Sequence, residues 1–370
     1  MSLAPQLDTI KVKAKTSKTS EQTSLNSSMG TQMTKDKKEK VGDLHLQDIA
    51  PDGICDFSVY GAGGAGKVAA LRFAVNNNPN NIPVTTIDTS GLSDVYEGVN
   101  SIRIGNLSGS GKLRKDNVDH IKDFVASYVE KETFGDVNVI IHSLSGGSGS
   151  VIGPMMIDEI LRQKKVAIAI VIIDQDSEVD TINALNSLRS LDNIVKSRKG
   201  YLPMIIFDNN NGRPTVDRGI DSTMINLSII LSTPLIGLDT KDRLRFFNPS
   251  GFDGVTSGVK LLNVSRDEVG NWEKNGQISA DDENEGIDSA LIISDQSEHR
   301  SLSRRCKVTF RGYYPKEGSP LIASVGYTIP EQVIKDLNAT IHGHRSAAAK
   351  KETKIESEYE IGEQQGGLIL

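Results

Sequence analysis

The sequence predicts an α/β fold with a parallel-sheet domain, a long central helix and a smaller α+β C-terminal domain. Three observations lead to this prediction. Short β-branched runs recur in the first half of the chain, a long apolar stretch then ends at a proline, and further strand-like runs follow that proline. The first runs lie at 56–60, 84–87, 137–141, 166–173 and 203–207, and the later ones at 258–263, 290–293, 307–311 and 321–327.

The first runs show little polar alternation, and helix-length stretches separate them. Strands of this kind are covered on both faces, which is typical of a parallel sheet flanked by helices. The long helix is predicted over 217–233, where an apolar stripe widens until the second half is apolar nearly all round, and Pro234 ends it. Such a helix is expected to lie buried between two layers.

The two ends of the chain differ from its middle. Residues 1–50 hold eight lysines and four acids up to Lys40 and few large apolar side chains. They are therefore expected to form a disordered basic arm, with a docking arm as the alternative. After a helix near 330–338, the end is expected to be an extended acidic tail with an apolar tip. The predicted divisions are 1–50 for the arm, 51–216 for the nucleotide-binding domain, 217–233 for the central helix, 234–340 for the C-terminal domain and 341–370 for the tail.

The composition limits what the protein can bind and where it works. The 370 residues suffice for two domains with substantial cores, and the net charge of −6 gives no reason to expect nucleic-acid or membrane binding. No apolar run is long enough to span a bilayer, and no signal peptide is recognisable. The only cysteines, Cys55 and Cys306, lack metal-type spacing, which favours a reducing, cytoplasmic compartment.

The first glycine-rich loop, Gly61 to Lys67, follows the strand at 56–60. Glycines let main-chain N–H groups face an anion, and the following helix adds its positive end. The loop satisfies G-x-G-x-x-G with Asp88 at the separation of a ribose-binding acid, which is typical of a dinucleotide site. It also approaches a P-loop, but Val68 replaces the magnesium-binding hydroxyl. A glycine turn for tight strand–helix packing is a third interpretation.

A second glycine-rich loop follows the strand at 137–141. A dinucleotide fold does not require this loop, whereas a triphosphate requires more donors than one loop supplies, so the pair favours a polyphosphate. The loop's small residues are Gly146, Gly147, Ser148, Gly149 and Ser150. A third segment, Gly109-Ser110-Gly111, precedes basic residues and is interpreted either as a solvated surface loop or as a sensor of the terminal phosphate.

The segment Ser-Leu-Ser-Gly-Gly-Ser-Gly-Ser-Val-Ile-Gly-Pro at 143–154 resembles the glycine signature of the tubulin/FtsZ superfamily. Phage-encoded PhuZ-type tubulins carry a very similar segment, and the resemblance runs from about Cys55 to the C-terminus. It implies that the cofactors are GTP or GDP with Mg²⁺, that the 51–216 domain binds GTP, and that 234–340 is an activation domain.

The resemblance also implies roles for individual residues. The diphosphate would be held by both glycine loops, the metal and phosphates would lie near Asp88, and Gly109 to Gly111 would sense the γ-phosphate. No direct protein ligand to the metal is predicted. Guanine would contact Asn209 and Asp217, although an Asn-rich turn is a sufficient explanation of Asn209 by itself. The first-loop residues carried over are Gly63, Gly64 and Ala65; the segment 174–178 is too diverged to assign, and Lys67-Val68 replace the family's amide.

Two carboxylates, Asp239 and Asp242, follow the central helix and share one side of a helical turn. Helix capping is one interpretation of the pair. The resemblance implies instead that they are the catalytic acids for the neighbouring subunit, although Gly237 replaces the usual leading Asn. A helix of some 20 residues separates them from the nucleotide by about 30 Å. Only head-to-tail stacking of subunits would bring them to it, and such stacking builds filaments.

The sequence thus predicts a filament-forming GTPase that is activated by assembly. The resemblance implies that it positions phage DNA or the phage nucleus in the cytoplasm of a host bacterium, with copies of itself and a phage DNA- or capsid-associated adaptor as partners. Two alternatives stay open: an NAD(P)-dependent Rossmann oxidoreductase, and a filament regulator that keeps the fold but has lost hydrolysis.

Overall fold

The computed structural model describes residues 53–78, 80–90, 96–105, 111, 114–129, 131–266, 287–295, 306–329 and 331–365. The basic arm predicted for residues 1–50 lies outside the described residues, as do Gly109 and Ser110 of the predicted γ-phosphate sensor. Gly111 is described, and its φ of 56° is one that glycine adopts readily.

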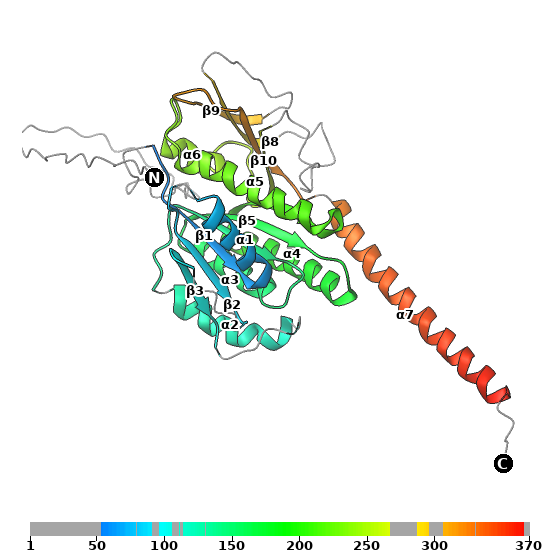
Figure 1. The fold of residues 1–370 in the computed structure, drawn as a ribbon. Coiled ribbons are helices and arrows are strands. Elements are labelled where there is room, and N and C mark those ends of the chain that lie inside the picture. Colours follow the sequence, from blue (N-terminus) through cyan, green and yellow to red (C-terminus); the bar gives the residue numbers. More distant parts are fainter. Residues whose placement is uncertain are drawn as a thin grey trace, which may run out of the picture. The chain divides into compact units, whose positions relative to one another are not determined.

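Ten strands form one sheet with the order β3-β2-β1-β4-β5-β6-β7-β10-β8-β9 (Figure 1). The strands are β1 (Phe57–Ala62), β2 (Val84–Asp88), β3 (Val99–Arg103), β4 (Val137–Ser143), β5 (Val166–Ile173), β6 (Tyr201–Asp208), β7 (Gly258–Ser265), β8 (Ile287–Ser294), β9 (Cys306–Tyr313) and β10 (Leu321–Tyr327). The helices are α1 (Gly63–Asn76), α2 (Arg114–Val129), α3 (Gly149–Arg162), α4 (Glu178–Arg198), the short 3₁₀ helix η2 (Asn209–Asn211), α5 (Arg213–Ser232), α6 (Thr240–Phe247) and α7 (Glu331–Gln365).

Helices cover both faces of this sheet, as the apolar strands predict. Strand β5 is buried along its whole length, and its alternate side chains enter two separate cores. One core holds side chains of α2, α3, α4 and the first part of α7; the other holds side chains of α1, α5 and α6. The α/β fold class, with its parallel sheet and long central helix, is confirmed.

The C-terminal strands extend the first sheet, a continuity that the sequence did not predict. Strand β7 pairs in parallel with β6, for example Leu202 with Val259, and then pairs antiparallel with β10. The two sets of strands therefore share hydrogen bonds across β6 and β7. Helix α5 packs against both of these strands and against α6.

Strand β3 was not predicted. Its sequence, Val-Asn-Ser-Ile-Arg, has no β-branched run, because it lies at one edge of the sheet and its residues are exposed or half-buried. Edge strands need only one hydrogen-bonded neighbour and one partly covered face, so their apolar signal is weak.

The extended tail predicted beyond residue 345 is wrong over most of its length. Helix α7 begins at Glu331 and continues to Gln365, well past the predicted end near 338. Its first part packs on α4, where Arg345 pairs with Glu178 at 2.6 Å. In the described part of the chain, no helix combines the length and apolar character that crossing a membrane requires.

Candidate functional site

The two glycine-rich loops touch one another at the carboxyl ends of β1 and β4. A β-carbon built on Gly63, whose φ is 69°, would lie 2.4 Å from the nitrogen of Gly149. One built on Gly149 would lie 2.9 Å from the carbonyl oxygen of Ala62, and one on Gly66 would lie 2.0 Å from that of Ile141. These approaches leave no room for a side chain. The glycine pattern therefore serves close packing and also brings two sets of main-chain amides to one place.

Both helices that leave these loops begin without a side-chain cap. Neither Ala62, at the start of α1, nor Ser148, at the start of α3, makes a side-chain capping bond, and neither first turn contains an acid. By contrast, Ser177 caps α4 with its side chain, and two acids occupy that first turn. The first amides of a helix have no acceptor within the helix and carry its positive end. The starts of α1 and α3 are thus suited to an anion.

Side-chain hydrogen bonds join the second loop to its neighbours on both sides. Thr89, just after β2, shares a 2.5 Å hydrogen bond with the Ser148 hydroxyl, and both side chains are buried. On the other side, the Ser145 hydroxyl donates to the carbonyl of Asp174 at 2.7 Å and accepts from its amide at 2.8 Å. The edge formed by β2, β1, β4 and β5 is therefore one connected structure.

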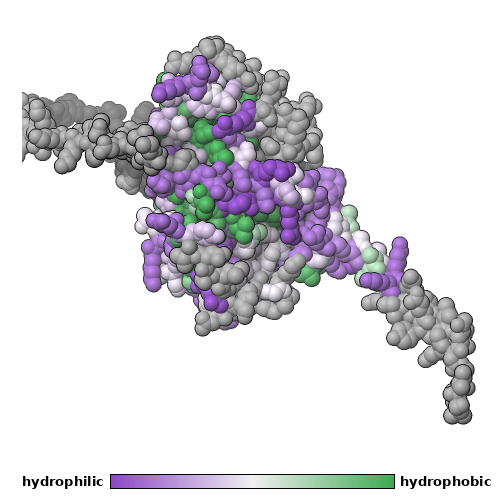
Figure 2. All heavy atoms as spheres, in the orientation of Figure 1, coloured by the Kyte–Doolittle hydropathy of each residue, from purple (hydrophilic) through white to green (hydrophobic). Residues whose placement is uncertain are grey.

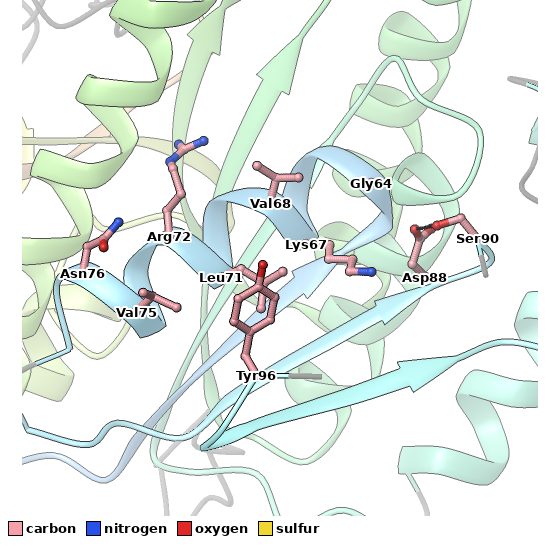
Figure 3. A pocket seen from close by; sticks show the side chains of 10 residues that line it. All are labelled: Gly64, Lys67, Val68, Leu71, Arg72, Val75, Asn76, Asp88, Ser90 and Tyr96. Carbon is pink, nitrogen blue, oxygen red and sulfur yellow. Dashed lines mark hydrogen bonds between the residues drawn. The ribbon is translucent and has the colours of Figure 1, made fainter. Parts of the chain in front are cut away.

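Asp88 lies beside the first loop, at one end of a cavity of about 380 Å³ that runs along α1 (Figure 3). Its carboxylate accepts from the amide of Thr89 at 2.8 Å and from the hydroxyl of Ser90. Lys67 and Gly64 line the same end. Farther along, exposed Val68, Val75 and Tyr96 line the cavity together with Arg72 and Asn76. Figure 2 shows apolar surface on the face of the molecule where α1 lies. Among the described residues, no group of three or more His, Cys, Asp or Glu side chains is placed to hold a metal ion.

The two residues expected to contact guanine lie on either side of the start of α5: Asn209 in the β6–α5 connection and Asp217 in the second turn of the helix. Asn209 donates to Asp174 at 3.4 Å, so its loop contacts the one after β5. Asp217 pairs with Arg72 of α1 at 3.0 Å and remains half exposed. The same guanidinium binds Asp221, one turn farther along α5, at 3.1 Å. Arg72 thus joins α1, which starts at the first glycine loop, to the first turns of α5. No sequence pattern predicts this contact.

Asp239 and Asp242 lie at the other end of α5. Asp239 is the N-cap of α6, and its carboxylate accepts from the amide of Asp242 at 2.8 Å, so the capping interpretation holds for Asp239. Asp239 is exposed and Asp242 is half-buried. Burial, and secondarily the nearby charge of Asp239, raise the pKa of Asp242. The 20 residues of α5 make a helix about 30 Å long, which separates this pair from the Asn209 loop at its other end.

His142, at the end of β4, is fully buried beneath the second loop. A β-carbon built on Gly153 of α3 would lie 2.4 Å from its ring, so a glycine is needed where the helix crosses the imidazole. Neither ring nitrogen makes a hydrogen bond of normal geometry with the described residues. Burial lowers the pKa of His142 to about 4, so the ring is neutral at pH 7. No sequence pattern predicts this buried position.

Structural comparison identifies the fold as that of the tubulin/FtsZ superfamily. A protofilament structure of TubZ from bacteriophage PhiKZ matches with a TM-score of 0.68 and 21% identity, covering 80% of this chain and 92% of that one. A structure of the phage tubulin PhuZ with GDP matches with a TM-score of 0.69 and 15% identity, covering 80% and 93%. An FtsZ from M. jannaschii matches with a TM-score of 0.57.

The sequence matches cover less of the chain than the structural matches, and the matched proteins come from phages. No protein-family model matches the chain. The phage tubulin-like protein of Pseudomonas phage phiKZ is 31% identical over 122 residues, 33% of this chain and 35% of that protein. That of Pseudomonas phage PhiPA3 is 24% identical over 194 residues, 51% of this chain and 60% of the relative. The matches thus span about a third to three fifths of these relatives. The chain is a homologue of phage tubulin-like proteins, which confirms the resemblance read from the glycine loop.

The close approach of the loops predicts opposite outcomes for two neighbouring glycines. Gly66→Ala is expected to lower the free energy of unfolding by about 1–3 kcal/mol, because its methyl group would collide with the β4 main chain. Gly64→Ala, the matched control, meets nothing within 4 Å and is expected to change stability by less than about 1 kcal/mol. Urea unfolding measures both, and equal effects would contradict the packing described here.

The buried imidazole predicts a dependence of stability on pH. Because the pKa of His142 is lowered from 6.5 to about 4, the unfolded chain binds a proton that the folded chain rejects between these values. Stability contributed by the neutral ring is therefore lost as the pH falls from about 6.5 to 4, by up to about 1.4 kcal/mol per pH unit. His142→Leu is expected to reduce this slope in urea unfolding. His120→Leu, which removes an exposed histidine of α2, is the control; equal slopes in all three proteins would refute the assignment.

Proposed function

We propose that this protein binds GTP, assembles head to tail into filaments, and hydrolyses GTP only where two subunits meet. One observation carries the proposal: the glycine cradle and the Asp239/Asp242 pair lie at opposite ends of the buried helix α5. A distance of about 30 Å along a packed helix cannot close within one subunit. The acids of one copy reach a nucleotide only in the cradle of the next.

The cradle would hold the phosphates mainly through the main chain. The amides at the starts of α1 and α3 supply donors, and the Lys67 side chain lies at the same end of the cavity. Guanine would lie toward α5, where Asn209 offers an amide and Asp217 a carboxylate. A carboxylate accepts hydrogen bonds from the ring N–H and the exocyclic amino group of guanine together, and adenine does not present this pair of donors. This chemistry supports GTP over ATP.

Magnesium fits the residues at the polar end of the cavity. Mg²⁺ is usually held by one or two carboxylates together with phosphate oxygens and water. The Asp88 carboxylate, beside Gly64 and Lys67, would lie near the ion and contact its bound water. When bound, the ion would neutralise charge on the phosphate oxygens. The lack of a larger acidic cluster among the described residues is compatible with an ion held chiefly by the nucleotide.

Hydrolysis would depend on the incoming acids. Asp242 is half-buried with a raised pKa, and it lies next to exposed Asp239 on a structured helix start. A carboxylate of this kind can orient a water molecule and accept its proton as the water attacks the γ-phosphate. Asp239 caps the helix that carries Asp242, and we propose that it supports this water from the other side. Turnover therefore requires the neighbouring subunit.

The oxidoreductase alternative has less support. It requires the Asp88 carboxylate to bind two ribose hydroxyls. It also leaves the second glycine loop without a role. The sheet order in the first six strands does not separate the two functions, because dinucleotide-binding folds share it. The homologous phage tubulin-like proteins support the filament proposal.

We further propose that the filament works in the cytoplasm of an infected bacterium and positions phage DNA or the phage nucleus through an adaptor. The support is the source of the relatives, which are proteins of Pseudomonas phages, and the filament structures among the neighbours. The chain's own surface does not identify the cargo.

A shared catalytic site predicts complementation between two inactive variants. Asp242→Ala removes the acid but keeps the cradle. Gly64→Asp keeps the acid and places a negative charge in the cradle, where the open space around Gly64 admits it. Neither variant alone is expected to hydrolyse GTP, whereas a 1:1 mixture is expected to regain about a quarter of the wild-type rate, because one random interface in four joins two intact halves. Phosphate release is the measurement.

The wild-type protein provides the reference for this test. Its turnover per subunit is expected to rise sharply above a threshold concentration, at which negative-stain images show filaments. A flat rate per subunit at all concentrations, or full activity of Asp242→Ala alone, would refute a catalytic site shared between subunits.

The position of Asp217 predicts selectivity for the guanine amino group. ITP lacks this group and is otherwise a close analogue of GTP, so the wild-type protein is expected to bind GTP more tightly. Asp217→Asn removes the charged acceptor and is expected to reduce the ratio of the two affinities about tenfold or more. Asp221→Asn, one turn farther along and bound to the same Arg72, is the matched control. Equal GTP and ITP affinities in the wild-type protein would exclude this role for Asp217.

A further inference from the structure

Arg243 is the largest fully buried side chain in the described part of the chain. It lies in the first turn of α6, directly after Asp242. Its guanidinium donates to three main-chain carbonyls: that of Ile230, that of Thr233 at 2.8 Å and that of Leu238 at 3.4 Å. A buried cation is costly unless its donors are satisfied, so a position like this demands a structural reason.

Two of these carbonyls belong to the end of α5. The last four carbonyls of a helix lack donors within the helix, and they carry its negative end. At this end, the Ile229 carbonyl accepts from the Thr233 amide at 3.2 Å and the Leu231 carbonyl accepts from the Cys55 amide at 2.9 Å. Arg243 supplies donors to Ile230 and Thr233. A side chain of the next helix thus completes the C-terminal cap of α5.

The third carbonyl belongs to the loop that carries the acids. Leu238 immediately precedes Asp239, and the Arg243 amide donates to the carbonyl of Asp239 at 3.2 Å. The two acids therefore lie between two points, Leu238 and Arg243, that the same residue fixes. Farther out, Ile236 pairs with Tyr313 in both directions at 2.9 Å, which ties the loop to β9. Within the described part of the chain, the hydrogen bonds of Arg243 link this loop to the end of α5.

We propose that Arg243 is the positioning residue for the catalytic acids: it fixes Asp239 and Asp242 relative to the end of α5, so that they enter the neighbouring subunit's cradle in one arrangement. The inference rests on the proposed function, in which these acids act on the next subunit's nucleotide. Arg243 touches no nucleotide and acts only through the loop. Its loss therefore affects hydrolysis and leaves the cradle of its own subunit intact.

The test uses the full chain with Arg243→Met, which preserves most of the side-chain volume and removes every donor. GTP binding and the threshold concentration for assembly are expected to stay near those of the wild-type protein. Turnover per assembled subunit is expected to fall about a hundredfold, since displacement of a catalytic group by about 1 Å has such an effect. Arg198→Met is the control: it removes an arginine of α4 that pairs with Asp158 of α3, and it is expected to keep the wild-type rate.

Mixtures of variants distinguish displaced catalytic acids from a general loss of structure. Arg243→Met retains its cradle, so mixing it with Gly64→Asp, which retains its acids, is expected to restore turnover. Mixing it with Asp242→Ala is not expected to restore turnover, because neither protein then supplies correctly placed catalytic acids. Wild-type turnover by Arg243→Met alone, or a folded variant that Gly64→Asp cannot rescue, would overturn the proposal.

Arg243→Lys covers the case in which the methionine variant fails to fold, as judged by circular dichroism. Lysine keeps the charge at the end of α5 but lacks the planar fork that reaches α5 and Leu238 together. It is expected to fold, bind GTP and hydrolyse it more slowly than the wild-type protein; an unchanged rate would again overturn the inference. If Asp242→Ala itself hydrolyses GTP normally, the proposed function fails first. If Asp242→Ala is inactive and both Arg243 variants are fully active, only the role of Arg243 fails.

Discussion

The fixed length of α5 is the constraint on which the rest of the structure depends. Its 20 residues run from the loop that carries Asn209 to the loop that carries Asp239, and ten of them are buried. It packs on the sheet at β6 and β7 and also contacts α1 and α6. A helix enclosed in this way cannot bend to bring its two ends together. Any chemistry that needs both ends must use two molecules.

The proposed phosphate site relies on helix starts and main-chain amides. At the starts of α1 and α3 the sequence places small residues and no acid, and each helix end stays uncapped by a side chain. Where no anion is expected, the chain does the reverse: Ser177 caps α4 and Asp239 caps α6, with acids in both first turns. Helix α5 also starts without a side-chain cap or a first-turn acid, so an uncapped start is informative only together with the glycine loops.

Local patterns in the sequence were sufficient to predict most strands and the glycine loops. The eight-residue apolar run of β5 and the seven residues of β10 were located at both ends. Strand β3 was missed because an edge strand needs no apolar run, and the β6–β7 pairing was missed because nothing in either strand encodes its neighbour. The length of α7 was underestimated because a helix beyond the core keeps no apolar periodicity to read.

The parts of the site whose residues are neighbours in sequence were predictable. The contacts between residues far apart in sequence were not. Glycine spacing located both loops, and the paired acids were visible as neighbours in sequence. Contacts such as Thr89 with Ser148, or Arg72 with Asp217, join residues 59 and 145 positions apart, and single-sequence patterns carry no record of them. The buried His142 was hidden for a related reason: beside a glycine signature, a histidine looks like any polar residue until its burial is known.

Arg72 and Arg243 hold the two ends of α5 through different kinds of contact. Arg72 binds carboxylates that are partly exposed to solvent, where ion pairs are weak and rearrange at little cost. Arg243 binds buried carbonyls, and releasing it would leave both a cation and helix-end oxygens unsatisfied. The Arg72 end of α5 can therefore adjust its contacts, while the Arg243 end keeps one geometry. In the proposed function, Asp239 and Asp242 must fit a partner's site, and a fixed geometry favours that fit.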